Sequence, residues 1–158
     1  MTIYSDQYFP AGGEAGAGGG ILQVTYTIKT DKWARNSSAF GDITGLYTCI
    51  TPRHSNNKIL VIAKCSCGAG GGGIDNKIRL QYSLSGSRYT IGNNQFVRQG
   101  GSQENFEWTM IHMHHPNTTG QLCYYVQGMA SSNEIFINRD GSNELLGDSV
   151  IMALEVSS

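Results

Sequence analysis

The residues most suited to chemistry are the histidines of the segment His112-Met113-His114-His115. Side chains two positions apart in a β-strand point to the same side, so His112 and His114 would share a face with Trp108 and Met110. If that face lined a threefold axis, three copies would present enough imidazoles for an octahedral metal ion. The alternative interpretation is that the histidines end a strand before the turn at Pro116 and are hydrogen-bonded or exposed.

The chain has four cysteines, Cys49, Cys65, Cys67 and Cys123. Cys65 and Cys67 share one side of a predicted strand, and with His112 and His114 they would make a tetrahedral zinc site if the two strands are neighbours. The alternative interpretation is that the cysteines are small, buried, apolar thiols. Because the N-terminal residues do not form an export signal, we expect all four to be reduced.

Catalytic signatures are missing from the sequence. No segment matches a nucleophile elbow or a cysteine-protease motif. The glycine run at 68–73 lacks the Lys and the Ser or Thr that a phosphate loop requires. We therefore expect a protein that is not an enzyme and that holds no cofactor beyond the candidate metal at His112 and His114.

The charge of the chain excludes several classes of partner. Charged residues make up 15% of the sequence and the net charge is -1, so no field attracts nucleic acid. No apolar run approaches the ~20 residues that a membrane-spanning helix needs. We expect binding neither to nucleic acid nor within a membrane.

Hydrophobic alternation at period two predicts the elements that position these residues. It runs through 22–28, 78–84, 106–110, 122–126 and 150–156, with turn signals between the runs. The segment 59–67 is apolar on both faces in part, which indicates a central strand or one covered by a partner. About eight strands with this spacing predict an all-β protein, an antiparallel β-sandwich of jelly-roll type whose sheets each bury one face.

Residues 1–20 differ in composition from the β-sandwich domain predicted for residues 21–158. They carry aromatic residues and then the glycine-rich stretch GGEAGAGGG, which indicates an attachment arm. We expect this arm to be held against another subunit, on which Tyr4, Tyr8, Phe9 and Pro10 would dock.

Two predicted loops carry side chains typical of receptor recognition, because aromatic rings stack and amides pair with hydroxyls. These candidate receptor-facing residues are Trp33 and Arg35 in one loop, and Tyr89, Asn93, Asn94, Phe96 and Arg98 in the other. The alternative is that they are turn residues or subunit contacts.

The order of motifs between residues 21 and 156 resembles a family of small virion proteins of tailed bacteriophages from marine and cyanobacterial hosts. The resemblance rests on ILQVTYTIKTDKW, FGDITGLYTCITPRHSNNKILVIA, HHPNTTGQLCYYVQ, IFINRDGSN and the closing strand VIMALEV. It implies a β-sandwich that assembles as a homotrimer on the outside of the virion. Such a trimer would form after synthesis in the host cytoplasm.

The resemblance implies an external appendage, such as a tail-fibre knob, attached by its N-terminal arm and used for adhesion to the host surface. Its partners would be capsid, neck or tail proteins of the virion and a glycan or protein of the host. A capsid decoration protein that cements the head shell is the second interpretation. A free-standing sugar-binding module is the third.

Overall fold

The computed structural model describes residues 2–8, 20–69, 74–99, 106–131 and 134–158. Side chains of residues 2–8, 69, 74–75 and 93–99 fall outside that description. The regular elements of the described ranges are all strands, and none of the described residues belongs to a helix long and apolar enough to cross a membrane.

The strands are β1 (Thr2–Tyr8), β2 (Ile21–Lys29), β3 (Trp33–Arg35), β4 (Gly41–Ile50), β5 (Lys58–Ala69), β6 (Ile74–Leu84), β7 (Ser87–Gln99), β8 (Phe106–His114), β9 (Leu122–Met129), β10 (Ile135–Ile137) and β11 (Ser149–Val156). Six of these strands coincide with the apolar runs of the sequence, and β1, β3, β4, β7 and β10 lie outside those runs.

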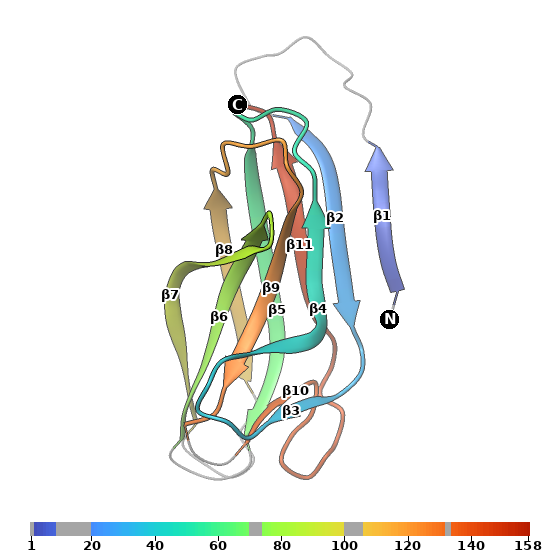
Figure 1. Ribbon diagram of the computed structural model, residues 1–158. Helices are drawn as coiled ribbons and strands as arrows, with labels where there is room; N and C mark the ends of the chain where they lie inside the picture. The colour runs from blue at the N-terminus through green and yellow to red at the C-terminus, as the bar shows by residue number, and fades with distance from the viewer. Residues whose placement is uncertain (1, 9–19, 70–73, 100–105, 132–133) are drawn as a thin grey trace.

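These strands form two antiparallel sheets that lie against each other (Figure 1). The body of the larger sheet has the order β2-β11-β5-β8, with β1 outside β2 and the short β10 and β3 beside the end of β5. The smaller sheet has the order β4-β9-β6-β7. The chain crosses between the sheets from β3 to β4, β4 to β5, β5 to β6, β7 to β8, β8 to β9 and β9 to β10, as in a jelly roll, so the predicted jelly-roll β-sandwich is confirmed.

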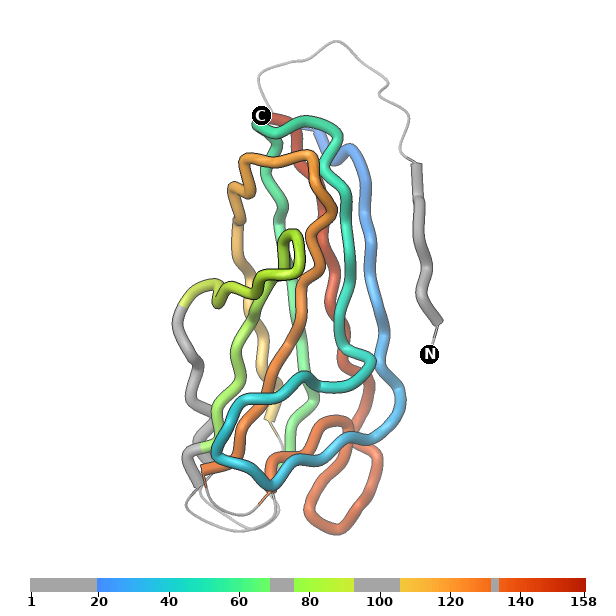
Figure 2. Tube along the Cα trace, viewed as in Figure 1, coloured from blue at the N-terminus to red at the C-terminus, as the bar shows by residue number. Residues whose placement is uncertain are grey.

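The two ends of the sandwich domain meet within the larger sheet. Strand β2, near the start of the chain, pairs antiparallel with β11, at its end, as the blue and red segments of Figure 2 show. Strand β5 lies between β11 and β8 and is therefore central, which confirms the interpretation of its apolar residues on both faces.

The core lies between the sheets and contains the predicted apolar residues of β6, β8 and β9. Ile78, Leu80, Leu122, Tyr124 and Val126 are fully buried in it. The larger sheet contributes the inward side of β5, from Ile59 to Cys67 at every second residue. Cys65 and Cys67 are free, buried thiols, as one interpretation of the sequence predicted.

The alternation of β2 and β11 has the predicted period, but their more apolar side faces outward. In β2 the buried residues are Thr25, Thr27 and Lys29, and in β11 they include Glu155. Hydrogen bonds satisfy these polar groups: the Thr48 hydroxyl donates to Oγ1 of Thr25 at 3.0 Å. Since burying a polar group without a partner is costly, such pairing is what allows polar residues to occupy the inner side.

The prediction of four reduced cysteines is wrong for one pair, since Cys49 and Cys123 form a disulfide. The two residues stand directly opposite each other on β4 and β9, so strand pairing brings their sulfur atoms together. They are 74 residues apart in the chain, and the sequence carries no local sign of this pairing.

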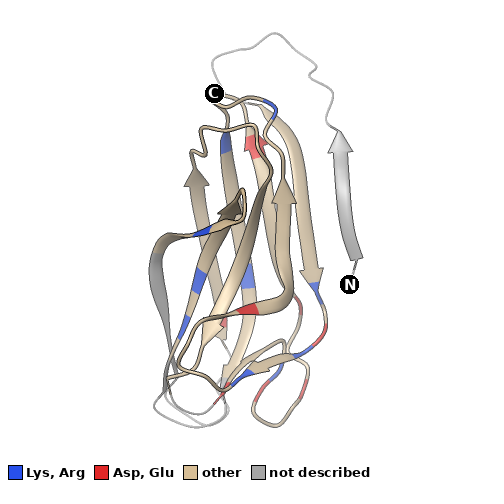
Figure 3. Cartoon of the chain, in the orientation of Figure 1, with Lys and Arg blue, Asp and Glu red and all other residues tan. Residues whose placement is uncertain are grey.

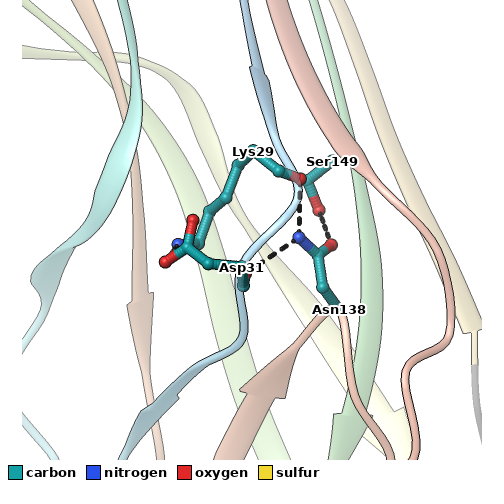
Figure 4. A network of polar contacts seen from close by, with 4 residues as sticks. All are labelled: Lys29, Asp31, Asn138 and Ser149. Atoms are coloured by element: carbon teal, nitrogen blue, oxygen red, sulfur yellow. Dashed lines mark hydrogen bonds and ion pairs between the residues drawn. The ribbon is translucent and has the colours of Figure 1, made fainter. Parts of the chain in front are cut away.

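A buried polar network built on Asn138 joins β10 to β2 and β11 (Figure 4). The Asn138 side-chain amide donates to the backbone oxygens of Lys29, at 2.7 Å, and Asp31, at 3.1 Å, and its oxygen accepts from the Ser149 hydroxyl at 2.6 Å. Asn138 has a φ of 61°, a conformation that Asn tolerates better than most residues. This network holds one end of the larger sheet.

Candidate functional site

The outer face of the larger sheet is an unusually apolar surface, which we call the assembly face. It consists of Val24, Tyr26, Ile28, Leu60, Ile62, Ile111, Met113, Val150, Met152, Leu154 and Val156. Strand pairing arranges these residues in rows across β2, β11, β5 and β8. One row is Tyr26–Met152–Ile62–Ile111, and the next is Val24–Leu154–Leu60–Met113.

Several side chains of the assembly face are strongly exposed in the isolated chain. Ile111 is 65% exposed, Met113 47% and Ile28 36%. At a strand spacing of about 4.8 Å and a rise of about 3.3 Å per residue, four strands by seven residues cover roughly 400 Å². That is the size of the largest contiguous apolar patch on a typical monomer, about 300–600 Å², and such a patch is often functional.

Charges are confined to the margins of the assembly face. Lys58 and Lys64 lie at the two ends of the β5 portion, and Lys64 pairs with Glu107 of β8 at 2.9 Å. Figure 3 shows charged residues scattered singly over the sandwich, without a dense basic cluster. The centre of the assembly face thus offers apolar contact without a charge that a partner would have to desolvate.

The structure places His112 and His114 on the face of β8 that carries Trp108 and Met110, as predicted, and this face is turned toward the other sheet. Nδ1 of His114 lies 2.9 Å from the Tyr124 hydroxyl oxygen, and its ring packs against Tyr82 at 4.4 Å between centroids. The hypothesis of a metal on a threefold axis needs these imidazoles on an outward face. The packing of His114 within its own chain contradicts it.

Burial and the neighbouring His112 and His115 lower the pKa of His114 to about 4, so its imidazole is neutral at pH 7. Burial raises the pKa of the Tyr124 phenol, which stays protonated. The pair therefore makes a neutral hydrogen bond at the edge of the core. This agrees with the alternative interpretation of the histidines as hydrogen-bonded residues at a strand end.

The predicted zinc site of Cys65, Cys67, His112 and His114 is also wrong. The strands are neighbours, as the hypothesis required, but Cys65 stands opposite Trp108 and His112 stands opposite Val61. Four residues of strand, about 13 Å, separate the two positions. Within the described residues, no group of three or more His, Cys, Asp or Glu is arranged to hold a metal ion.

The predicted receptor-facing loops are strands in the structure. Trp33 and Arg35 lie in β3, where the Trp33 ring packs against the core and the Arg35 side chain donates to the Ala39 oxygen at 3.0 Å. These contacts within the chain replace the exposed loop expected there.

The second predicted loop belongs to β7, which pairs with β6 along most of its length. Tyr89 is 47% exposed and stacks on Tyr82 at 5.0 Å. Asn93, Asn94, Phe96 and Arg98 also lie in β7, but their side chains are outside the described part of the chain.

Part of the predicted arm is a strand of the same chain. Tyr4 and Tyr8 lie in β1, which pairs antiparallel with β2 so that Tyr4 is opposite Tyr26. Phe9 and Pro10 fall outside the described residues. Strand β1 therefore covers the edge of β2 that would otherwise present unpaired backbone groups.

Sequence reasoning missed Ile111 and Met113 as surface residues of the assembly face. The signal was present in β8, where Trp108 and Met110 occupy one side and Ile111 and Met113 the other. A strand that is apolar on both sides toward one end needs cover on both, as a central strand does.

No family model matches the chain. No curated protein matches it either.

Solved structures resemble it at low sequence identity and low TM-score. A chain of infectious bursal disease virus, Gx strain, is 10% identical with a TM-score of 0.45, over 86% of this chain and 37% of that one. Family 16 carbohydrate-binding module 2 is 14% identical with a TM-score of 0.35, over 72% and 79%. The xylan-binding domain CBM22-1 of Paenibacillus barcinonensis Xyn10C is 12% identical with a TM-score of 0.36, over 87% and 97%. The chain spans well under half of the viral chain, and the likeness concerns the β-sandwich alone.

Proposed function

We propose that this chain is a virion structural protein of a tailed bacteriophage, assembled as a homotrimer through the assembly face. The observation that carries the proposal is the orientation of strand β2, whose polar side faces the core. It buries Thr25, Thr27 and Lys29 and leaves the apolar Val24, Tyr26 and Ile28 on the outer side. An arrangement of this kind is unfavourable for a monomer in water, because apolar surface left exposed contributes no burial energy. It becomes favourable when the outer side is covered as well.

Copies of this chain are the proposed cover. The apolar area of roughly 400 Å² is about half of the ~800 Å² that each partner contributes to a specific interface, so the proposed interface also includes the polar margins of the face. In a threefold assembly the face would be divided between two neighbours, so that the apolar rows line the axis. The resemblance of the motifs to tailed-phage virion proteins supports the trimer and the external position.

The proposal predicts the mass of the protein in solution. Sedimentation at micromolar concentration should give three times the chain mass of 17.1 kDa. Ile111→Lys should give a monomer, because it places a charge in the middle of an apolar row. The matched control is Leu145→Lys, since Leu145 is 59% exposed but lies outside the assembly face.

Either of two results would refute this assembly. One is a wild-type protein that is monomeric at every concentration. The other is an Ile111→Lys variant that keeps the mass of the wild type while its circular dichroism is unchanged.

Attachment to the particle and adhesion to the host belong to the same proposal. We expect deletion of residues 1–20 to leave the sandwich folded, because its buried core begins at Ile43, and to abolish loading onto particles. Counting copies in purified particles distinguishes an appendage, present in a few copies, from a decoration protein of the head shell, present in hundreds. Loading that survives the deletion would place the attachment surface elsewhere.

A further inference from the structure

The outer face of the smaller sheet differs from the assembly face, because a chain of hydrogen-bonded polar side chains crosses it. We call this surface the polar face. Gln127 stands between Asp42 and Arg79, on neighbouring strands. Its amide donates to Asp42 Oδ1 at 2.7 Å, and its oxygen accepts from Arg79 Nε at 2.8 Å. Arg88 of β7 also donates to Asp42 Oδ1, at 2.7 Å. Residues from all four strands are thereby held in fixed positions.

Arg79 has unused hydrogen-bonding capacity in this network of side chains. Its Nε is occupied by Gln127, and its guanidinium lies 4.0 Å from the centroid of the Phe40 ring. Among the described residues, no carboxylate forms a salt bridge with Arg79 and none accepts from its two terminal amino groups. Burial lowers the pKa of Arg79, and the charge of Asp42 offsets only part of this effect. A half-buried guanidinium of this kind can bind a carboxylate through two parallel hydrogen bonds.

The Asp42 carboxylate does not occupy the terminal amino groups of Arg79. Burial alone would raise the pKa of Asp42, but hydrogen bonds from Arg88 and Gln127 lower it below its ordinary value. Its charge is therefore matched with Arg88. Among Arg79, Arg88 and Asp42, positive charge exceeds negative charge by one, and Arg35 also lies close enough to Asp42 to lower its pKa.

Aromatic rings lie beside Arg88 on the same face. Tyr125, two positions from Gln127 on β9, stacks with Tyr47 at 5.6 Å between centroids, and the Arg88 guanidinium lies 3.8 Å from the Tyr125 centroid. Tyrosines combine an apolar body with a hydroxyl, and this combination suits the C–H groups and hydroxyls of a sugar. An acidic peptide or a nucleic acid would be expected to need more cations than this face provides.

We infer that the polar face binds a saccharide that carries a carboxylate. The terminal amino groups of Arg79 hold the carboxylate, and the edges and hydroxyls of Tyr47 and Tyr125 contact the neighbouring sugar ring. The inference does not depend on the proposed trimer. It is compatible with it, because the polar face and the assembly face are the two opposite outer surfaces of the sandwich, so that assembly leaves the polar face open.

Nuclear magnetic resonance titration of the ¹⁵N-labelled full chain tests the inference. The probes are 3′-sialyllactose and tetragalacturonate. The neutral counterparts are lactose and the methyl ester of tetragalacturonate. We expect shifts of the Arg79 Nε–H and the Gln127 side-chain amide with at least one acidic probe, at an affinity at least ~10-fold above that for its neutral counterpart. A tenfold ratio corresponds to about 1.4 kcal/mol.

Variants separate recognition from folding. Arg79→Gln should weaken binding at least tenfold, and Arg79→Lys, which keeps the charge without the planar fork, should weaken it less. The matched control is Arg139→Gln, because the Arg139 guanidinium also lies over a phenyl ring, that of Phe136 at 3.9 Å, and bonds to Asn143. The control variant should bind like the wild type.

Three outcomes would overturn the inference. The first is that neither acidic probe shifts the two signals, and the second is that a folded Arg79→Gln variant keeps full affinity. The third is that inorganic phosphate or sulfate binds as tightly as the saccharides, since the face would then be a general anion site. Failure of the trimer test would leave these results unaffected, because the two experiments use different surfaces and variants.

Discussion

Loss of the Cys49–Cys123 disulfide should destabilise the sandwich by several kilocalories per mole. The bond closes a loop of 74 residues between β4 and β9. In the chain-entropy treatment of the unfolded state, a loop of this length corresponds to about 4 kcal/mol at 25 °C. Native cross-links usually contribute about 2–5 kcal/mol. We therefore expect reduction to lower the free energy of unfolding by about 2–4 kcal/mol.

Urea unfolding followed by tryptophan fluorescence measures this effect, with and without a phosphine reductant. The protein concentration is kept fixed, because the proposed assembly would also add stability. The double variant Cys49→Ala/Cys123→Ala should behave like the reduced wild type and should no longer respond to the reductant. The control is Cys65→Ala/Cys67→Ala, which removes the two free thiols and should keep the response.

Two observations would refute this reasoning. Thiol titration of the unfolded, unreduced protein should find two free cysteines, and finding four would show that the bond is absent. An oxidised protein whose unfolding midpoint does not move on reduction would show that strand pairing alone fixes β4 against β9.

Three further predictions concern buried polar groups. Because the pKa of His114 is about 4 in the folded chain and about 6.5 when unfolded, stability should be greatest above pH 6.5 and fall between pH 6.5 and 4. With allowance for partial exposure the loss should be about 1–2 kcal/mol, and His114→Gln should flatten the pH profile measured by thermal unfolding. Asn138→Ala should cost about 3 kcal/mol in urea unfolding, because three hydrogen bonds and a left-handed backbone depend on Asn138. Glu155→Gln should cost about 2 kcal/mol in the same assay. The Glu155 carboxylate accepts hydrogen bonds from the Arg53 backbone and from the Asn57 and Gln23 side chains, and the amide group of Gln would place a donor opposite one of these donors. An unchanged urea midpoint would contradict the prediction for Asn138 or for Glu155, respectively.

The sandwich could be predicted from the sequence because alternation at period two is a local signal. It identifies strands such as β6 and β9, whose apolar side is also their buried side. The same alternation does not say which side of β2 faces the core, because that depends on which sheet covers it. Partners far away in sequence decide it: the Thr27 hydroxyl is buried where it can donate to the Tyr47 backbone oxygen at 2.6 Å.

The short or interrupted strands were not predictable from local composition. The sequence of β7 contains the turn signal Gly92-Asn93-Asn94, yet its backbone pairs with β6 on both sides of a register shift. Strand β3 is three residues long and exists because β10 pairs with it. Tertiary pairing overrides local propensity in both cases.

The candidate sites depend even more on long-range pairing. Asp42, Arg79, Arg88 and Gln127 come from four separate strands, and only the order β4-β9-β6-β7 makes them neighbours. The histidines at 112 and 114, which are close in sequence, instead face the inside of the sandwich. Spacing along one strand determines which residues share a face, but the sheet determines what that face meets.

The two outer faces of the sandwich differ in composition, and the proposed assembly accounts for the difference. A two-layer protein in water needs one apolar side per strand, toward the core, and a polar side toward solvent. The smaller sheet follows this rule, and its polar side carries the linked Asp42, Gln127 and Arg79. The larger sheet departs from this rule, because four of its neighbouring strands are apolar on the outer side. A few isolated surface substitutions would not produce such a continuous apolar face. A departure confined to one sheet, with charges only at its margins, has the pattern expected when one face is covered by copies and the other stays in contact with the surroundings. Recognition of another molecule would then belong to the sheet that kept its polar side.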